Sequence, residues 1–564
     1  MNETAIFHEP ESKYCFAINS KTVKLRIRIA KSDNPYKVEV VYGGKYDFLS
    51  KQLIQEMDLI AIDKLYKYYG TTLSLDDLRL VYIFKFTIED KVLFYSEDGL
   101  SNFYDFMYNH YNCFQYAYIN QADVHQMING YDKAIFYQIF IDRFRIGLRD
   151  NKDYINLEWN SIPDPKSFAG GDLYGIIEKL DYIKSLGANY LYLTPVFKSL
   201  SNHKYDIIDY FTVDEMFGGN EYLYQLVSIA HQKGMKVVLD AVFNHCSDKN
   251  LLFVDVIKNG RNSKYYDWFI ITNDEPLEYQ CFSTCKYMPK FNTSNKEVCD
   301  YLIRVAKHWT KELSIDGWRL DVSDEVSHKF WRRFRDEIKA INKDCIIIGE
   351  NWHDANIYLR GDQFDSIMNY AVTKACLDFF AFRSINVKEF SEKLNGLLMR
   401  NTDTINNMML NLLDSHDTFR FFSRVNGDIE KVMSALALIY FYPGMPCIYY
   451  GTENMMEGNY DPDSRRTFDW DLEKIDNPVK TLIRKLSLLK QDGLSQGEYK
   501  LYTENNLLVL ERLIKGFIYR LIINGNEINI HYNSNNIILA SNENFHNLNP
   551  FGFIIEKIRR DRYD

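Results

Sequence analysis

Gly317-Trp-Arg-Leu-Asp321 is a short apolar segment, typical of a buried strand, and it ends in a carboxylate. The same arrangement recurs in Cys345-Ile-Ile-Ile-Gly-Glu350 and in Lys236-Val-Val-Leu-Asp240. A fourth segment, Met409-Leu-Asn-Leu-Leu413, runs into Asp414-Ser-His-Asp417. In a parallel barrel the carboxyl ends of all strands share one face, and active sites are built on that face. These segments therefore predict a barrel with acidic and imidazole groups gathered at one end.

Strands of this kind alternate with amphipathic helices from residue 131 onward. We predict the strands at Ala134–Phe140, Ala188–Thr194, Met235–Val242, Ile315–Asp321, Cys345–Glu350, Phe364–Asn369, Met409–Leu413 and Pro446–Tyr450. The predicted helices include Leu173–Leu186, Tyr222–Lys233, Val298–Leu313 and Glu325–Ile341. This alternation predicts an α/β fold of the (β/α)8, or TIM, barrel type. An open doubly wound sheet is the alternative, but the strand count and the absence of a glycine-rich phosphate loop after the first strand weigh against it.

The segments on either side of the barrel have the alternating pattern of β-rich domains. Strand patterns occur within residues 15–48 and again at Arg79–Phe86, and the stretch between them is polar and compatible with helix. We predict an N-terminal β-sandwich domain over 1–120, the barrel over 121–491 and a C-terminal β-sandwich domain over 492–564. Residues 246–294, between the third and fourth barrel strands, are too many for an ordinary loop, and we predict that they form an inserted subdomain.

The composition excludes several classes of protein. The chain has 67 Lys and Arg against 77 Asp and Glu, a formal net charge of −10, which speaks against nucleic acid as the main partner. No apolar run reaches the roughly 20 residues of a membrane span. Residues 1–10 contain acidic side chains and no apolar core, so we expect no secretory signal. The 9 cysteines follow no repeating spacing, so we predict free thiols and a cytoplasmic protein.

Asp321 and Glu350 are the central candidates for catalysis. Two carboxyl groups at neighbouring strand ends can flank a glycosidic bond, one attacking carbon and the other protonating the leaving oxygen, and in retaining glycosidases they lie about 5–5.5 Å apart. Arg319 is on the same side of the strand as Asp321, so we expect it to keep that carboxylate ionised. Glu350 must stay protonated, which requires a less polar environment and a carboxylate neighbour. Asp417 is the candidate for that neighbour.

Histidines also follow predicted strands. His245 and His416 could donate hydrogen bonds to sugar hydroxyls, and the segment after the second strand adds His203 and an aromatic platform, Tyr205. Each of these residues alone has an ordinary structural explanation, such as an aspartate that caps the next helix. Their joint placement at the strand ends favours a functional interpretation.

These segments resemble those of a known family. Asp240–His245, Gly317–Asp321, Gly349–His353 and Leu413–Asp417 are similar, in this order, to the four signature segments of the α-amylase superfamily (glycoside hydrolase family 13). Met288–Asn292, Gly170–Gly175, Leu193–Pro195 and Ser201–Asp206 are similar to segments of its neopullulanase, cyclomaltodextrinase and maltogenic-amylase branch. The resemblance extends over residues 131–490.

The resemblance implies roles for individual residues. Asp321 would be the nucleophile, Glu350 the general acid/base and Asp417 the stabiliser of the transition state. The substrate-binding residues would be His203, Tyr205, Asn244, His245, Arg319, Trp352, His416, Asp461 and Arg465. Trp352 would help to form the first leaving-group subsite. Asp324 is an acid where the branch usually has asparagine, so the preference on the acceptor side stays open.

The resemblance also bears on partners and metals. The N-terminal domain looks like the starch-binding-type domain of the branch, which implies a homodimer formed through it. The family often places a calcium site on the loop after the first strand. Here the loop Arg143–Asp150 has apolar residues where oxygen ligands would be expected, and only Asn151, Asp153, Gly170 and Asp172 could contribute. We therefore predict no well-formed calcium site and no required cofactor.

Together these observations predict a retaining hydrolase of α-1,4 bonds in maltooligosaccharides, cyclodextrins, starch or pullulan, with transglycosylation as a side activity. An exo-acting α-glucosidase or oligo-1,6-glucosidase on the same scaffold is the alternative among enzymes. A non-catalytic carbohydrate-binding relative is the alternative from another class, but relatives of that sort lose catalytic carboxylates, and this chain has all three of them.

Overall fold

Eight parallel strands form the central barrel of the computed structural model, which describes residues 1–107, 111–148, 152–542 and 547–560. In chain order they are β11 (Phe136–Ile139), β12 (Tyr190–Leu193), β15 (Lys236–Ala241), β18 (Gly317–Leu320), β19 (Ile346–Gly349), β20 (Ser366–Ile367), β21 (Leu410–Leu412) and β22 (Met445–Tyr449). Each strand pairs with its neighbour in parallel, and a bridge between Met368 and Leu410 joins β20 to β21 and closes the barrel. All eight predicted barrel strands are confirmed.

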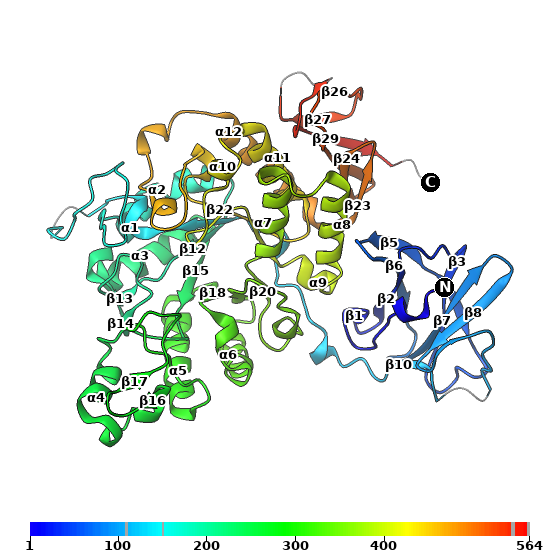
Figure 1. Ribbon diagram of the computed structural model, residues 1–564, viewed down its shortest axis with the longest axis horizontal. Coiled ribbons are helices and arrows are strands. Elements are labelled where there is room, and N and C mark those ends of the chain that lie inside the picture. Colours follow the sequence, from blue (N-terminus) through cyan, green and yellow to red (C-terminus); the bar gives the residue numbers. More distant parts are fainter. Residues whose placement is uncertain (108–110, 149–151, 543–546, 561–564) are drawn as a thin grey trace.

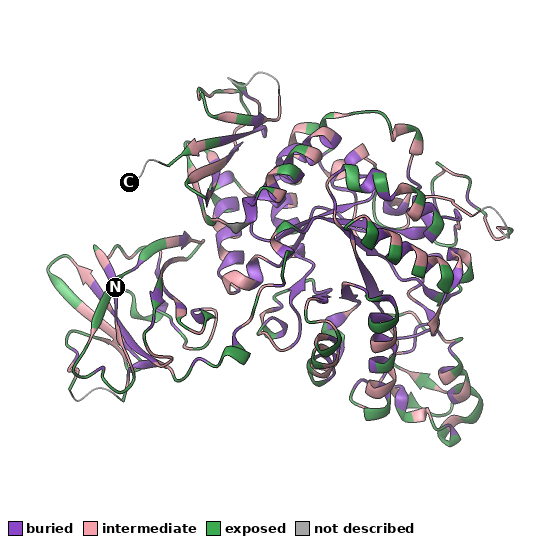
Figure 2. Cartoon of the chain, turned by 180° about the vertical axis from the view of Figure 1, so that it is seen from behind, coloured by how far each residue is buried: buried purple, intermediate pink, exposed green. Residues whose placement is uncertain are grey.

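The barrel strands are apolar on both sides because both sides are covered. Alternate residues, among them Phe136, Tyr192, Ile348 and Leu410, pack together inside the barrel. The intervening residues, such as Leu191, pack outward against the helices. Figure 2 shows this arrangement as buried strands surrounded by helices whose outer faces are exposed. The continuous apolar pattern of these strands is what a parallel sheet covered on both faces requires.

Helices surround the barrel (Figure 1). They are α1 (Ile141–Phe144), α2 (Leu173–Ser185), α3 (Gly219–Gln232), α5 (Lys296–Leu313), α6 (His328–Ile341), α7 (Tyr370–Cys376), α8 (Val387–Leu398), α9 (Asp403–Asn406), α10 (Phe421–Arg424), α11 (Ile429–Phe441) and α12 (Pro478–Gln491). Side-chain caps fix several helix starts, for example Asn295 at α5. The predicted start of α6 at Glu325 is wrong, because residues 323–325 form a separate 3-10 turn and the helix begins at His328.

Two sheets form the N-terminal domain. The first has the order β1 (Cys15–Asn19), β2 (Thr22–Ala30), β6 (Tyr66–Ser74) and β5 (Asp58–Ile62); the second has β4 (Leu53–Glu56), β3 (Lys37–Gly43), β7 (Leu80–Ile88), β8 (Lys91–Ser96) and β9 (Gly99–Ser101), with β10 (Phe114–Tyr116) beside β7. The helix-compatible interpretation of the stretch before Arg79 is wrong. That stretch supplies β4, β5 and β6, and all nine residues of β6 pair with β2, so sheet pairing decides its structure.

The N-terminal domain is attached to the barrel through charged contacts with α8 and α9. Arg26 and Lys24 on β2 both bind Asp403, and Lys31 lies 2.6 Å from Glu392. The Arg26 side chain is almost completely buried, so its pairing with Asp403 belongs to the interface rather than to the surface. The domain therefore lies beside the barrel rather than over the carboxyl ends of its strands.

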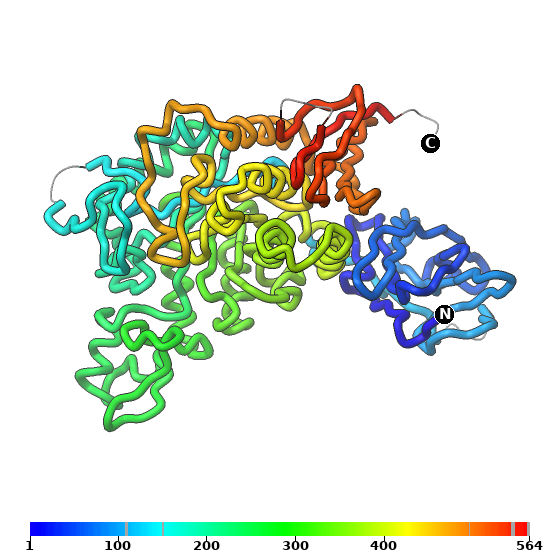
Figure 3. Tube along the Cα trace, turned by 45° about the horizontal axis from the view of Figure 1, so that its top comes forward, coloured from blue at the N-terminus to red at the C-terminus, as the bar shows by residue number. Residues whose placement is uncertain are grey.

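The insertion after β15 has a helix and a β-hairpin of its own. It contains α4 (Leu251–Asn259), β16 (Ile271–Asn273) and β17 (Glu278–Tyr279), and its end returns to the barrel through a bridge between His245 and Lys290. In Figures 1 and 3 it lies on the opposite side of the barrel from the N-terminal domain. The bridge brings Lys290 next to a strand end that carries candidate site residues.

A sheet of five strands follows the barrel at the C-terminal end, in the order β23 (Glu498–Glu504), β24 (Leu507–Ile514), β25 (Phe517–Asn524), β29 (Phe553–Arg559) and β27 (Ile537–Ala540). A pair of short strands, β26 (Ile530–His531) and β28 (Asn547–Leu548), accompanies it. The sheet packs against α8 and α11 (Figure 1). In the described ranges, none of the helices combines the length and the apolar character needed to cross a membrane.

Candidate active site

Arg319 is the centre of the candidate site. Its side chain is fully buried, and its NH1 lies 3.0 Å from Asp240 Oδ2 and 2.9 Å from Asp321 Oδ1. Its NH2 lies 3.0 Å from Glu350 Oε1 and 3.9 Å from Asp417 Oδ2. The carboxyl ends of β15, β18, β19 and β21 therefore deliver four carboxyl groups to one guanidinium, as the strand ends in the sequence predicted, although only three of the four were assigned a catalytic role. The hydrogen bonds from NH1 to Asp240 and Asp321 are charge-assisted and orient these two acids, whereas NH2 forms ion pairs with Glu350 and Asp417 without a hydrogen bond to either.

Burial controls the protonation of the central pair. It raises the pKa of Glu350 above its ordinary value, with Arg319 opposing the change and Asp417 adding to it. It also raises the pKa of Asp321 well above its ordinary value, because desolvation outweighs the contact with Arg319 and because Glu350, Asp240 and Asp417 repel a further negative charge. The expectation that Arg319 alone keeps Asp321 ionised is therefore too simple. The carboxyl groups repel one another in this buried space, so ionisation of one disfavours ionisation of the other.

Asp417 is held from the side opposite Arg319. Arg465 donates from NH2 to Asp417 Oδ1 at 3.2 Å and from Nε to the carbonyl oxygen of His416 at 2.8 Å. Arg465 NH1 also lies 3.3 Å from Asp461, whose side chain is 54% exposed. The loop after β22 thus contributes an anchored arginine to the site, and Asp461 lies at its rim.

His416 and Tyr205 form a stacked pair beside these carboxylates. Their rings are parallel to within 3°, and Tyr205 Oη lies 2.5 Å from His416 Nε2. His416 Nε2 also lies 3.1 Å from Asp417 Oδ2. His203 also stacks on Tyr205 and accepts a hydrogen bond from the Tyr205 backbone N–H through Nδ1. The structure therefore brings these three predicted binding residues together.

His245 and Asn244 lie at the end of β15, where the inserted subdomain begins. The His245 ring stacks on Phe282 with a centroid distance of 5.0 Å, and its Nε2 is buried without a hydrogen-bond partner among the described residues. Asn244 accepts a hydrogen bond from Lys290, which also lies 2.8 Å from Glu325. An unpaired buried ring nitrogen is costly, and a ligand hydroxyl would satisfy it.

Trp352 presents an aromatic face close to Glu350. Its ring stacks on Tyr370 with a centroid distance of 3.8 Å and an interplanar angle of 2°. Trp352 is 45% exposed whereas Tyr370 is buried. One face of the indole is therefore fixed by the protein, and the side chain keeps surface available for a ligand.

The family follows from the comparison with known proteins. The model of the alpha amylase catalytic domain matches residues 138–484, which is more than half of the chain. The chain belongs to the α-amylase family. The model of the N-terminal ig-like domain of alpha amylases matches residues 1–120.

Relatives within the α-amylase family match almost the whole chain. A cyclomaltodextrinase of Thermoanaerobacter pseudethanolicus (strain ATCC 33223 / 39E) is 42% identical over 93% of this chain and 92% of its own length. An intracellular maltogenic amylase of Bacillus subtilis (strain 168) is 38% identical over 90% of this chain and 88% of its own. A solved cyclomaltodextrinase structure covers 99% of this chain and 98% of its own with a TM-score of 0.89 at 35% identity.

The calcium ion that the α-amylase family implies after the first barrel strand does not fit the residues present. Lys152 Nζ lies 2.6 Å from the carbonyl oxygen of Gly170 and 2.9 Å from Asp172 Oδ2, where a cation would be expected to bind. Asp172 also accepts hydrogen bonds from the backbone N–H groups of Leu148 and Gly175. An ammonium group and backbone donors therefore already occupy the oxygens that a divalent cation would need.

The other oxygen donors predicted for this loop add little. Asp153 is exposed, and Asp150 and Asn151 lie outside the described residues. Within the described part of the chain, no three acidic, histidine or cysteine side chains are grouped in a way that could hold a metal ion.

Replacing Lys152 by methionine should destabilise the barrel by about 3 kcal/mol, because it leaves the fully buried Asp172 carboxylate without its cation. Thermal unfolding should show this as a lower melting temperature, and EDTA should leave the melting temperature of the unmodified protein unchanged. Lys249→Met is the matched control, because Lys249 forms an exposed pair with Asp248. A clear loss of stability in EDTA would contradict the argument.

Several residues of the α-amylase-type site were assigned no role from the sequence. Asp240 forms an ion pair with Arg319 and accepts a hydrogen bond from the hydroxyl of Tyr192. Burial raises the pKa of Asp240 to about 6. Gln138 and Tyr370 contact His416 and Trp352 respectively. The role of Asp240 could have been assigned, because it was already recognised in the sequence as the carboxylate at the end of an apolar segment, as Asp321 was. Nothing in the local sequence distinguishes Gln138 or Tyr370 from ordinary core residues.

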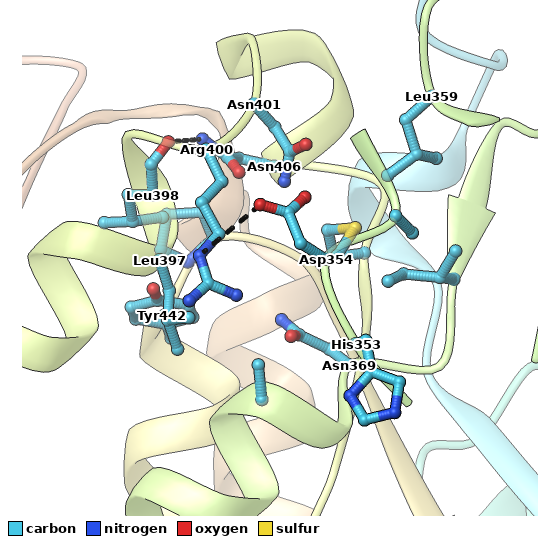
Figure 4. A pocket seen from close by; sticks show the side chains of 15 residues that line it. His353, Asp354, Leu359, Asn369, Leu397, Leu398, Arg400, Asn401, Asn406 and Tyr442 are labelled. Carbon is cyan, nitrogen blue, oxygen red and sulfur yellow. Dashed lines mark hydrogen bonds and ion pairs between the residues drawn. The ribbon is translucent and has the colours of Figure 1, made fainter. Parts of the chain in front are cut away.

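A small cavity lies beside the loop that follows Trp352 (Figure 4). It has a volume of about 30 Å³, and His353, Asp354, Asn369, Arg400, Asn406 and Tyr442 are among its lining residues. This volume holds one or two water molecules and no sugar ring. None of the candidate catalytic residues lines it, so it adds nothing to the site.

Proposed function

We propose that this protein is a retaining α-glucan hydrolase that cleaves α-1,4 bonds of maltooligosaccharides, cyclodextrins, starch or pullulan. The observation that carries the proposal is the contact of one buried guanidinium, Arg319, with both Asp321 and Glu350 at the ends of adjacent barrel strands. The names of the relatives, cyclomaltodextrinase and maltogenic amylase, support the substrate class.

The proposed reaction has two steps. Glu350, protonated, donates its proton to the glycosidic oxygen while Asp321 attacks the anomeric carbon and forms a glycosyl ester. Glu350, now a carboxylate, takes a proton from water, which attacks the ester and releases the sugar with its original configuration. A sugar hydroxyl in place of water gives transglycosylation. The first step passes the proton of Glu350 to the leaving sugar, and the second step restores it from water.

Neutral histidines suit the binding role that we propose for them. Burial lowers the pKa of His203 and of His245 to about 3, and it lowers the pKa of His416 well below its ordinary value. Each ring is therefore uncharged at neutral pH and can both donate and accept one hydrogen bond. Sugar hydroxyls, which also donate and accept, are matched partners for such rings. Asp417, held by Arg465, is the proposed acceptor for hydroxyls of the distorted sugar.

The exposed side of Trp352 is the proposed platform for the leaving-group sugar. Tyr370 stacks on one face of the indole with a centroid distance of 3.8 Å. The indole is therefore already fixed when a sugar stacks on it. Lys290 and Glu325, linked 2.8 Å apart, lie at the junction with the inserted subdomain and are proposed to border the same side of the site.

Product analysis tests the proposal. Incubation with β-cyclodextrin, pullulan, starch and acarbose, followed by chromatography, should give short maltooligosaccharides from at least one of the glucans. Opening of the cyclodextrin ring is the most specific result, because a closed ring has no chain end for an exo-acting enzyme. Release of glucose alone from chain ends would favour the exo-acting α-glucosidase instead. Binding without any release of reducing sugar would contradict hydrolysis altogether.

We also propose that the protein works in the cytoplasm and forms a homodimer through its N-terminal domain. The relative described as intracellular supports the location. Leu53 and Ile54 on the edge strand β4 are 43% and 57% exposed, which supports an apolar contact surface. Light scattering after size exclusion should give twice the mass of the chain. The substitution Ile54→Lys should shift the equilibrium between dimer and monomer toward the monomer.

A further inference from the structure

Gln138 is an amide buried in the interior of the barrel. Unlike the carboxyl and guanidinium groups of the site, it carries no charge. It lies on β11 and is fully buried. Its Nε2 lies 2.7 Å from Nδ1 of His416, which is fully buried as well. Gln138 lies on a barrel strand and His416 in the segment that follows β21, and close packing around both buried side chains holds the contact in place.

The neighbouring hydrogen bonds decide which nitrogen of His416 carries the proton. Tyr205 donates its hydroxyl hydrogen to Asp240 Oδ2 at 3.2 Å, so its oxygen is left to accept from His416 Nε2. Asp417 Oδ2, 3.1 Å from the same Nε2, also requires a donor there. Both contacts place the hydrogen on Nε2. The lone pair then lies on Nδ1, where it accepts from the Gln138 amide.

We propose that Gln138 is a positioning residue that holds His416 as the neutral tautomer with its proton on Nε2. The proton is thereby directed at Asp417 and at the sugar that the proposed function places beside it. With the proton on Nδ1 instead, a lone pair on Nε2 would face the Asp417 carboxylate and the Tyr205 oxygen. Both contacts would become repulsive, and the Asp417 carboxylate would lose its contact with His416 and keep those with Arg465 and Arg319. The inference rests on the proposed function for its kinetic consequence but not for the tautomer itself.

The surroundings of His416 favour the neutral ring. Arg319 and Arg465 are the positive groups beside it, His203 is neutral, and Asp417 is the nearest carboxylate. Arg465 also donates to the backbone carbonyl of His416 and fixes the main chain. A second proton would be buried between two guanidinium groups, which burial and charge both oppose. The choice at this residue is therefore between two neutral tautomers.

The direct test is a spectrum of the protein without substrate. The spectrum of protein labelled with 15N-histidine should contain a His416 signal, identified by its absence from His416→Asn. This signal should have the shifts of an Nε2–H tautomer. In Gln138→Leu, which removes the donor, the His416 signals should move toward a mixture of tautomers. If His416 in the wild-type protein carries its proton on Nδ1, the proposal is overturned, whatever the substrate of the enzyme proves to be.

Kinetics provide the second readout. Gln138→Leu should lower kcat about 10-fold with KM changed by less than about 3-fold, because the loss falls on the group that supports Asp417 in the transition state. Gln138→Glu keeps a donor only while its carboxyl group is protonated, so its activity should fall further as the pH rises through the pKa of that group. The same loss at every pH in both variants would indicate a merely structural role and would overturn the proposal.

Asn411→Leu is the matched control. Asn411 is a fully buried amide on β21, which β22 separates from β11, and it binds Asn369 and the carbonyl oxygen of Pro443 but not His416. Its replacement should lower the melting temperature as Gln138→Leu does, while the tautomer of His416 and the pH profile stay unchanged. If no variant or wild-type protein hydrolyses glucans, the proposed function fails, and the tautomer measurement still decides the inference.

Discussion

Replacing Asp321 by asparagine should reduce glucan hydrolysis by a factor of about 10⁴ or more and leave the protein folded. The amide cannot form the glycosyl ester, whereas its size is that of the carboxyl group it replaces. The change also removes one buried negative charge from a cluster in which the carboxyl groups repel one another, so unfolding temperatures should stay the same or rise. Reducing-sugar assays on maltooligosaccharides and circular dichroism measure the two effects.

Asp316→Asn is the matched control for this variant. Asp316 directly precedes β18, at the opposite end of the strand from Asp321, where it binds His231 at 2.8 Å and the backbone N–H of Val237. Its replacement should cost some stability and leave kcat within about 2-fold of the unmodified enzyme. Near-normal hydrolysis by Asp321→Asn would show that the proposed nucleophile is wrong. Comparable losses in both variants would indicate that the activity follows the stability of β18.

The barrel could be predicted from the sequence because its strands are buried on both sides. A segment such as Ile346–Gly349 must then be apolar throughout, and a polar residue after it is conspicuous. Strands with one side exposed carry a weaker signal. The nine residues of β6, Tyr66–Ser74, mix lysine, glycine and tyrosine, and their pairing with β2 on one side and β5 on the other makes them a strand.

The same distinction applies to the site. Asp321, Glu350 and Asp417 could be found because they are charged residues at the ends of apolar strands. Gln138 and Tyr370 act through other side chains, and their roles depend on distances across the barrel that no local pattern encodes. The protonation of Asp321 also escaped prediction. The sequence places an arginine beside it, whereas its pKa depends on how many carboxyl groups share the buried space.

Replacing Glu350 by glutamine should reduce hydrolysis of maltooligosaccharides about 10³-fold or more, because the leaving oxygen then receives no proton. Substrates whose leaving group needs no proton, such as α-maltosyl fluoride, should still form the glycosyl ester on Asp321. The raised pKa of Glu350 has a further consequence. The unmodified enzyme should keep its acid form above the ordinary pH range of a glutamate and lose activity as the pH rises through that pKa. This alkaline limb should be absent from Glu350→Gln with the fluoride.

Azide separates the two carboxyl groups by the configuration of the product. In Glu350→Gln the ester on Asp321 forms on the β face, so azide attacks from the α face and gives an α-glycosyl azide, with faster turnover of the fluoride. In Asp321→Ala there is space for azide on the β face, and direct displacement of the α-fluoride gives the β-glycosyl azide instead. Opposite anomers from the two variants, read by NMR, would fix which residue is the nucleophile. The same anomer from both would contradict the assignment, since one carboxyl group cannot occupy both faces of the sugar.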